Sequence, residues 1–130
     1  MRDEHQLLQL RPDLQLPANQ SKPEETFQNQ TLRPILKMQH ALLIHLFNTH
    51  IQKRKNVFFK LAKPARLEWI TDAVRADLRF RNLLFGTIIG HFTIDELRTF
   101  ESNEAEFLRR LTKLIIQRLQ SEDFEGLENQ

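Results

Sequence analysis

Residues 77 to 96, DLRFRNLLFGTIIGHFTIDE, contain the apolar run that decides the fold of this 130-residue chain. Its apolar side chains go almost all the way around a helical projection, which is typical of a helix buried at the centre of a domain. The segment therefore predicts a central helix from about Asp77 to His91. Glycine costs roughly 1 kcal/mol relative to alanine inside a helix, so Gly86 indicates a close approach of another backbone. Gly90 is placed to end the helix.

Helical patterns continue on both sides of this segment, with apolar residues recurring every three or four positions. Only three glycines and five prolines are present, too few for the many tight turns of a β-sandwich or barrel. The fold class predicted is an all-α, single-domain bundle of four to five helices. The other expected helices run from about Glu24 to Lys53 with Pro34 at its regular start or at a kink, Pro64 to Ala76, Thr93 to Phe100 with a Thr93–Glu96 capping box, and Glu104 to Gln120 capped by Asn103.

The two ends of the chain lack this pattern. Residues 1–25 contain three prolines and a polar run, which predicts an N-terminal arm that is extended or partly disordered, although its leucines could dock on the domain. Residues 26–120 form the expected helical domain. Residues 121–130 carry four acids and a glycine, which indicates an acidic flexible tail.

Charge is distributed unevenly between these parts. Residues 1–30 carry three basic and five acidic side chains, residues 31–120 carry sixteen basic and eight acidic, and the last ten carry four acids. A basic body with a net charge of +8 thus lies between two acidic ends, which favours an anionic partner. The longest apolar run is far shorter than a membrane span of about 20 residues, and no signal peptide pattern is present. We expect a cytoplasmic protein that does not enter a membrane.

Catalytic and metal-binding signatures have no positive support in the sequence. There is no cysteine, no glycine-rich phosphate loop, no nucleophile elbow and no H-E-x-x-H pattern. His40, His45 and His50 share one predicted helix, but a spacing of five rotates successive side chains by about 140° and points them to different faces. We therefore expect no metal site, no cofactor and no catalytic residue.

One polar group at the ends of the central helix has two interpretations. Asp77 and Arg81 are four residues apart, the spacing of a helical ion pair. Together with Asn82 and His91 they could form a buried network that fixes the helix register, or line a pocket for a small ligand or substrate. The structural interpretation is favoured, and the pocket is kept as an alternative.

A basic stretch follows the first long helix, where cations alternate with Phe58 and Phe59. Such interleaving is found in nucleic-acid-binding surfaces, but a charged junction between two helices gives the same pattern. The candidate residues for an anionic partner are Lys53, Arg54, Lys55, Lys60, Lys63 and Arg66.

Two segments, FQNQTLRPILKMQ at residues 27–39 and DLRFRNLLFGTIIGHFTIDE at residues 77–96, resemble a family of small uncharacterised helical proteins of Bacteroidetes-type bacteria. Some members of that family carry the automatic label "glyoxalase". Metal-dependent glyoxalases need ligands presented by strands or a dense histidine cluster, and this sequence predicts neither. The resemblance implies a helical cytoplasmic protein without an assigned activity.

These observations predict a small non-enzymatic interaction or regulatory protein. Its partner would be another protein or a second copy of itself, because the apolar stripe of the last helix is wide for its length. The first alternative is association with RNA or the ribosome through the basic face. The second is a small-ligand binder or enzyme that uses the polar pocket around Asp77 and Arg81.

Overall fold

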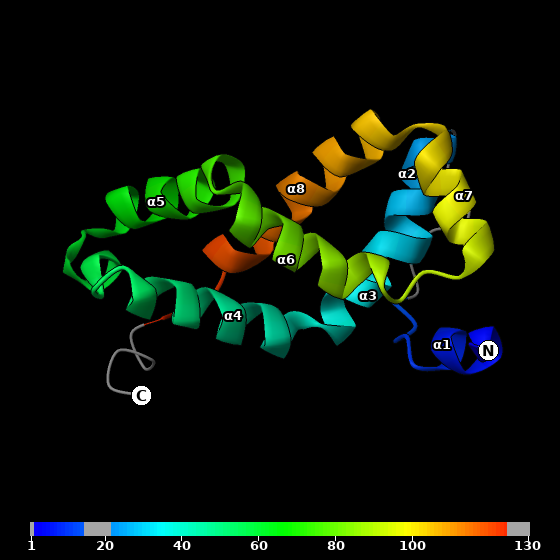
Figure 1. Cartoon of the computed structure of the whole chain (residues 1–130), viewed down its shortest axis with the longest axis horizontal. Helices are drawn as coiled ribbons and strands as arrows, with labels where there is room; N and C mark the ends of the chain where they lie inside the picture. Colours follow the sequence, from blue (N-terminus) through cyan, green and yellow to red (C-terminus); the bar gives the residue numbers. More distant parts are fainter. Residues whose placement is uncertain (1, 15–21, 125–130) are drawn as a thin grey trace.

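The computed structural model describes residues 2–14 and 22–124, and every regular element in these ranges is a helix (Figure 1). This confirms the all-α fold. None of the described helices is both long and apolar enough to cross a membrane. The elements in chain order are α1 (Glu4–Gln9), α2 (Pro23–Phe27), the π-helical η1 (Gln28–Leu32), α3 (Arg33–Met38), α4 (His40–Lys53), the 3₁₀-helical η2 (Val57–Lys60), α5 (Lys63–Ala76), α6 (Leu78–Ile89), α7 (Ile94–Ser102) and α8 (Glu104–Gln120).

The expected helix from Glu24 to Lys53 is nearly continuous but changes geometry twice. Proline has no N–H to donate, and its ring crowds the carbonyl four residues earlier. The turn before Pro34 accommodates this by widening into η1, where the Arg33 N–H donates to the carbonyl of Gln28, five residues back. A second break lies at Gln39, whose side chain donates to the Thr87 carbonyl of α6 at 3.0 Å. The irregularity predicted at Pro34 is therefore confirmed, whereas the break at Gln39 was not predicted.

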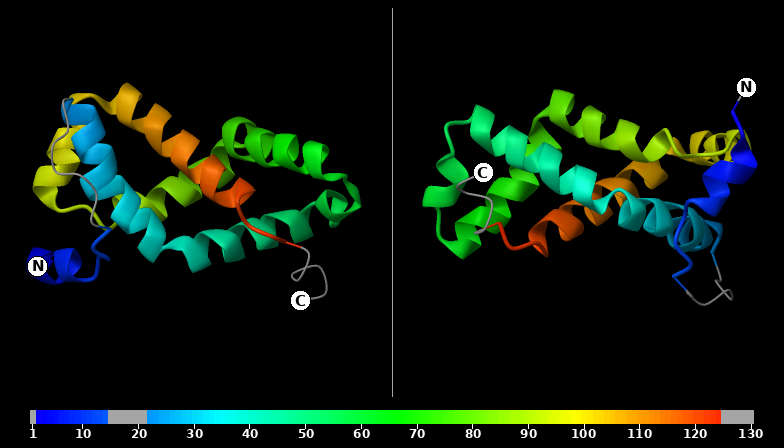
Figure 2. Two further views of the ribbon diagram at one scale, coloured as in Figure 1. Left: turned by 180° about the vertical axis from the view of Figure 1, so that it is seen from behind. Right: turned by 90° about the horizontal axis from the view of Figure 1, so that it is seen from below.

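Four helices enclose the main core. Helix α8 packs against α5 and α4, and α6 packs against α4 and α5. Seen from behind, α8 runs diagonally from the α7 end of the molecule toward the end where α4 and α5 are joined (Figure 2). The residues of these helices that are at most 2% exposed recur every four positions and form one buried stripe per helix: Leu43, Phe47, Ile51, Ile70, Val74, Leu84, Ile88, Leu111, Ile115 and Leu119.

Aromatic rings fill the two ends of this core. At the α2 and α7 end, Phe27 contacts the rings of Phe92 and Phe107 with centroids 5.7 and 4.6 Å apart. At the α4–α5 end, Phe47 and Phe58 lie edge to face at 5.6 Å. Because η2 delivers Phe58 to the interior, this helical turn after α4 closes the core at that end.

Helix α6 is central in position but buried on one side only. Leu78 and Leu83 are 56% and 51% exposed, so the prediction of a helix buried all around was wrong. Among the described residues, no atom beyond its neighbours and its own helix lies within 4 Å of the position that a Cβ would take at Gly86, which also overturns the expected close backbone approach. Gly90 does end the helix, as predicted, with ordinary right-handed backbone angles.

Side-chain capping explains where α7 starts, but the predicted cap of α8 by Asn103 was wrong. Thr93 and Glu96 form the predicted capping box: the Thr93 hydroxyl accepts from the Glu96 N–H, and the Glu96 carboxylate accepts from the Thr93 N–H. Asn103 occupies the N-cap position of α8 but makes no side-chain capping bond. Its amide is instead directed to Glu24 at 3.5 Å.

The N-terminal residues and the residues after α8 pack more closely on the helical domain than the sequence predicts. Residues 4–9 of the predicted arm form helix α1, with Asp3 as its N-cap, in place of extended chain. In the predicted flexible tail, Phe124 is only 3% exposed and its ring lies 5.1 Å from that of Phe47. Residues 121–124 thus belong to the packed domain, while 15–21 and 125–130 fall outside the described residues.

Candidate functional site

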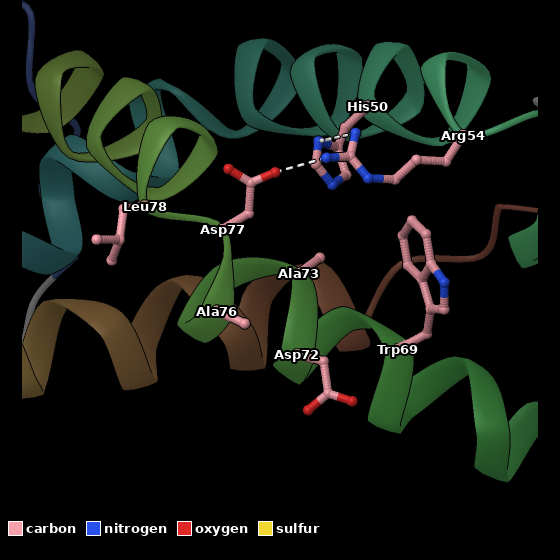
Figure 3. Close-up of a pocket in the computed structure, with 8 residues that line it drawn as sticks. All are labelled: His50, Arg54, Trp69, Asp72, Ala73, Ala76, Asp77 and Leu78. Atoms are coloured by element: carbon pink, nitrogen blue, oxygen red, sulfur yellow. Dashed lines mark hydrogen bonds and ion pairs between the residues drawn. The ribbon is translucent and has the colours of Figure 1, made fainter.

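A groove of about 490 Å³ opens between α4, α5 and the first residue of α6 (Figure 3). Both polar and apolar side chains line it. Its formation follows from the break between α5 and α6, because Asp77 has extended backbone angles and turns the chain from one helix into the next. The lining residues are His50, Arg54, Trp69, Asp72, Ala73, Ala76, Asp77 and Leu78.

Three of these side chains form a linked polar cluster. The Asp77 carboxylate accepts from the Phe80 N–H at 3.1 Å, which caps α6, and from Arg54 Nη2 at 2.6 Å. Arg54 Nη1 lies 3.2 Å from Nδ1 of His50, one turn earlier on α4. The Phe80 hydrogen bond, followed by the Arg54 charge, holds the pKa of the Asp77 carboxyl below its usual value. Asp77 is therefore an anion that anchors Arg54.

His50 is held in one orientation by aromatic rings. It is 6% exposed, stacks on Phe80 with ring centroids 3.9 Å apart, and meets Trp69 edge to face at 5.8 Å. Burial and the neighbouring Arg54 guanidinium lower the pKa of His50, so the imidazole is neutral at pH 7. Since a guanidinium can only donate, Nδ1 accepts its hydrogen bond and the proton resides on Nε2.

This tautomer determines what the groove can do chemically. A histidine that serves as general base keeps a free Nε2 lone pair by donating from Nδ1 to a carboxylate, whereas here Arg54 occupies Nδ1 and Nε2 carries the proton. No serine, threonine, cysteine or lysine is among the groove residues. Within residues 2–14 and 22–124, no three or more acidic, histidine or cysteine side chains are grouped to hold a metal ion. The arrangement is suited to binding.

The predicted polar pocket of Asp77, Arg81, Asn82 and His91 is not formed. The Asp77 side chain pairs with Arg54, the C-cap residue of α4, and no side-chain bond joins it to Arg81 within the described chain. The two residues share only the backbone hydrogen bond from the Arg81 N–H to the Asp77 carbonyl. Arg81 instead lies over the ring of Phe85, with its guanidinium carbon 5.6 Å from the centroid. Asn82 is exposed. Because the twelve residues of α6 separate Asp77 from His91 by about 18 Å, these residues cannot line one site.

His91 belongs to a separate cluster beside the N-terminal segment. Arg11 donates to the His91 carbonyl at 2.6 Å, and Arg2 donates to the carbonyls of Gly90 and Phe92. The His91 Nδ1 atom is buried and has no hydrogen-bond partner in the described structure. Burial, with the charges of Arg11 and Arg2, lowers the pKa of His91. His91 therefore has a structural role, in the contact between the end of α6 and the N-terminal segment.

The predicted basic surface divides into structural and solvent-facing residues. Arg54 is held in the groove, as described. Arg66 donates to the carbonyls of Phe59 and Leu61 and lies over the Phe58 ring at 5.1 Å. Phe58 is 1% exposed, so it is part of the core and not a platform for stacking bases. These contacts favour the helix-junction interpretation for the two arginines of the surface.

The four lysines of that surface remain exposed around the connection between α4 and α5. Lys55, together with Asn56, has a φ of 58°, so this left-handed pair reverses the chain after α4. The exposed side chains are Lys53, Lys55, Lys60 and Lys63.

Sequence reasoning missed the groove because its members come from three helices. His50 was considered only as a metal ligand, and Trp69 and Asp72 carried no motif. A signal was present in Asp77 followed by Phe80, since an aspartate three residues before an apolar helical position is also an N-cap pattern. If Asp77 is an N-cap, its carboxylate lies at the start of α6 and does not need to pair with Arg81, so it can bind a residue of another helix.

No protein-family model, curated protein or solved structure matches this chain. The family resemblance of residues 27–39 and 77–96 therefore stays a prediction, and the function has to be argued from the geometry.

Proposed function

We propose that this chain is a non-catalytic interaction protein that binds a segment of a partner protein in the groove between α4 and α5. The observation that carries the proposal is the composition of the groove: Leu78, 56% exposed, and the half-buried Trp69 lie beside a charge cluster that is neutralised internally (Figure 3). An exposed leucine and an aromatic ring that line the same groove offer apolar area that a partner can bury.

Charge indicates the chemistry of the partner. Arg54 and Asp77 compensate one another, whereas Asp72 at the groove edge is exposed and has no ion pair within the described chain. Glu68 lies one turn before Asp72 on the same helix and is also exposed. The groove is therefore acidic on balance. A segment that places a lysine or arginine beside one or two apolar side chains, as on one face of an amphipathic helix, complements it.

The protonation of the cluster supports binding over catalysis. With its Nε2 proton, neutral His50 can donate one hydrogen bond to a backbone carbonyl of the partner but cannot accept a proton through that atom. The lining residues include no serine, threonine, cysteine or lysine, and the Asp77 carboxylate is engaged by Arg54 and the Phe80 N–H. The alternative of an enzyme that uses Asp77 and Arg81 together has less support, because Asp77 pairs with Arg54 and Arg81 lies over the Phe85 ring.

Trp69 makes the proposal directly testable, because it is the single tryptophan of a chain without tyrosine. Two amphipathic peptides with the same leucines, one carrying lysines and the other glutamates, are titrated while Trp69 fluorescence is recorded. The lysine peptide should change the emission and bind at least about tenfold more tightly than the glutamate peptide. Equal binding of both peptides, or of neither, would contradict the proposal.

Variants locate the binding site. Leu78→Ser and Asp72→Lys should each weaken the lysine peptide about tenfold or more. Leu83→Ser is the matched control, because Leu83 is a similarly exposed leucine of α6, at 51%, that does not line the groove. If Leu83→Ser weakens binding as much as Leu78→Ser, the peptide is not bound in this groove.

A second function, RNA association through the lysines between α4 and α5, is favoured by one observation: Lys53, Lys55, Lys60 and Lys63 are all exposed at one end of the molecule. Binding through phosphate contacts releases counterions and must weaken steeply as salt rises. A single-stranded RNA oligonucleotide should therefore bind at 50 mM salt and lose most of its affinity at 200 mM. An affinity that is independent of salt would exclude this function.

A further inference from the structure

A second groove, of about 330 Å³, lies on the surface formed by the end of α5, α6 and the first half of α8. Three arginines from the three helices line it: Arg75, Arg81 and Arg109. The rest of the lining includes Phe85 and Ala105, and it contains no acidic residue. Three like charges brought together by different helices repel one another, so a ligand that compensates them is the natural complement of this surface.

The hydrogen-bonding capacity of these arginines is only partly used. The Arg75 residue is exposed, and its side chain makes no hydrogen bond or ion pair within the described ranges. Arg81 has a buried Nε that lacks an acceptor, and its guanidinium is steadied over the Phe85 ring at 5.6 Å. Buried donors in native proteins are almost always satisfied. An unsatisfied Arg81 donor beside a positively charged groove favours a ligand that brings a hydrogen-bond acceptor.

Arg109 is positioned by its own helix. Its Nε and Nη2 donate to the Glu106 carboxylate at 3.0 and 2.6 Å, one turn earlier on α8. Glu106 also accepts from Arg110 at 2.8 Å, and the hydrogen bonds from Arg109 and Arg110 lower its pKa to about 2. Glu106 therefore remains ionised, holds Arg109 by two of its nitrogens, and leaves Nη1 of Arg109 for a ligand.

We infer that this groove binds the phosphate group of a phosphomonoester. The planar forks of several arginines match the oxygens of a phosphate better than a single ammonium does. A doubly charged monoester also matches the charge of Arg75 and Arg81, the two groove arginines without a carboxylate partner in the described chain, whereas Arg109 is paired with Glu106. The small volume accommodates one phosphate with a compact organic group. Because Phe85 is 7% exposed, the groove offers no stacking surface for successive bases, which favours a small phosphate ester over an RNA strand.

The test compares probes at constant ionic strength in the intact chain. Inorganic phosphate and phenyl phosphate are titrated against a chloride control, with thermal unfolding and amide chemical shifts as readouts, and an RNA oligonucleotide without terminal phosphates forms a third arm. Phenyl phosphate should raise the Tm and shift amides of residues 75–85 and 105–112. A shift for inorganic phosphate alone would show that the organic group is not recognised and would overturn the monoester assignment.

Substitutions distinguish specific binding in this groove from nonspecific attraction to the positive charge of the protein. Arg75→Gln and Arg81→Gln should each weaken phenyl phosphate about tenfold, and the exposed Arg75 can be replaced without disturbing the core. Arg79→Gln is the matched control, since Arg79 is an exposed arginine of α6 that does not line the groove, and its effect should stay within about twofold. Equal losses at Arg79 and Arg81, an equal response to chloride, or binding of RNA without binding of phenyl phosphate would each overturn the inference.

Discussion

Arg11 and Glu96 form a two-pronged ion pair across 85 residues of sequence, with Nη1 to Oε2 and Nη2 to Oε1 both at 2.7 Å. The side chains are only 7% and 18% exposed. Glu96 at the same time closes the capping box of α7 and accepts from the Thr31 hydroxyl at 3.2 Å. Although burial opposes its ionised form, the hydrogen bonds from Arg11, Thr93 and Thr31 lower the pKa of Glu96. One carboxylate thus joins the N-terminal segment, η1 and α7.

The first prediction concerns this pair. Arg11→Ala leaves the largely buried Glu96 carboxylate without its cationic partner and removes the hydrogen bond to the His91 carbonyl. The free energy of unfolding should therefore fall by about 2–3 kcal/mol. Urea unfolding followed by circular dichroism measures this loss. Arg98→Ala serves as the control, because the Arg98–Asp95 pair is 74% and 93% exposed and should contribute less than about 0.5 kcal/mol. Equal losses in the two variants would show that Arg11 is an ordinary surface residue.

The second prediction is a loss of stability in mild acid. The pKa values of His50 and His91 are lowered in the folded chain, in both cases mainly by burial, whereas both are near 6.5 in the unfolded chain. Between these values the unfolded chain binds more protons, so the stability that the neutral imidazoles provide is complete above pH 6.5 and decreases as the pH falls below it.

Unfolding free energies measured between pH 8 and pH 5 test this sign. The curve should be flat above about pH 7.5 and descend below about pH 6.5. The double variant His50→Gln, His91→Gln should start from a lower stability but lose most of this slope. A wild-type curve that rises toward pH 5.5 would contradict the lowered pKa values. The carboxylates of Asp77, Glu96 and Glu106, whose pKa values are also lowered, add a further loss at lower pH.

The third prediction uses the two glycines of α6. Gly86 is exposed, and a Cβ added there would contact no atom of the described residues, so Gly86→Ala should stabilise the chain by about 1 kcal/mol through helix propensity alone. The Cβ of an alanine at position 90 would lie 3.0 Å from the Gly86 carbonyl oxygen, so Gly90→Ala should give no such gain. Thermal unfolding of the two variants distinguishes them, and a destabilised Gly86→Ala would revive the close approach expected from the sequence.

The sequence predicted where helices begin and end better than it predicted which of their faces are buried. Thr93, Glu96 and Pro64 act within one or two turns of their own positions, where capping rules apply directly, and the structure confirms them. The exposure of Leu83, by contrast, depends on whether another element covers that side of α6. A residue pattern that is apolar all around predicts such a cover, but no described element of this chain supplies it.

Side-chain partners were harder to predict for the same reason. Asp77 has a local candidate in Arg81, four residues later, and a distant one in Arg54. Its N-cap geometry places the carboxylate at the start of α6, close to α4, and so the distant partner is selected. The α4–α5 groove and the arginine groove both arise from helix packing, which local spacing does not encode, and this is why neither was predicted as a unit.

The last prediction tests whether the chain after α8 belongs to the fold. The acidic composition of residues 121–130 predicts a solvated tail, and in that case Phe124→Ala would change the stability by less than about 0.5 kcal/mol. In the structure the Phe124 ring lies 5.1 Å from that of Phe47 and 5.6 Å from that of Phe58, so the substitution should cost about 3 kcal/mol through the lost contacts and the cavity left behind. Phe124→Leu should recover part of this loss. Leu42→Ala, at a position 41% exposed, is the control and should cost much less. Urea unfolding monitored by Trp69 fluorescence measures all three, because Trp69 lies 5.8 Å from Phe47 in the same aromatic cluster.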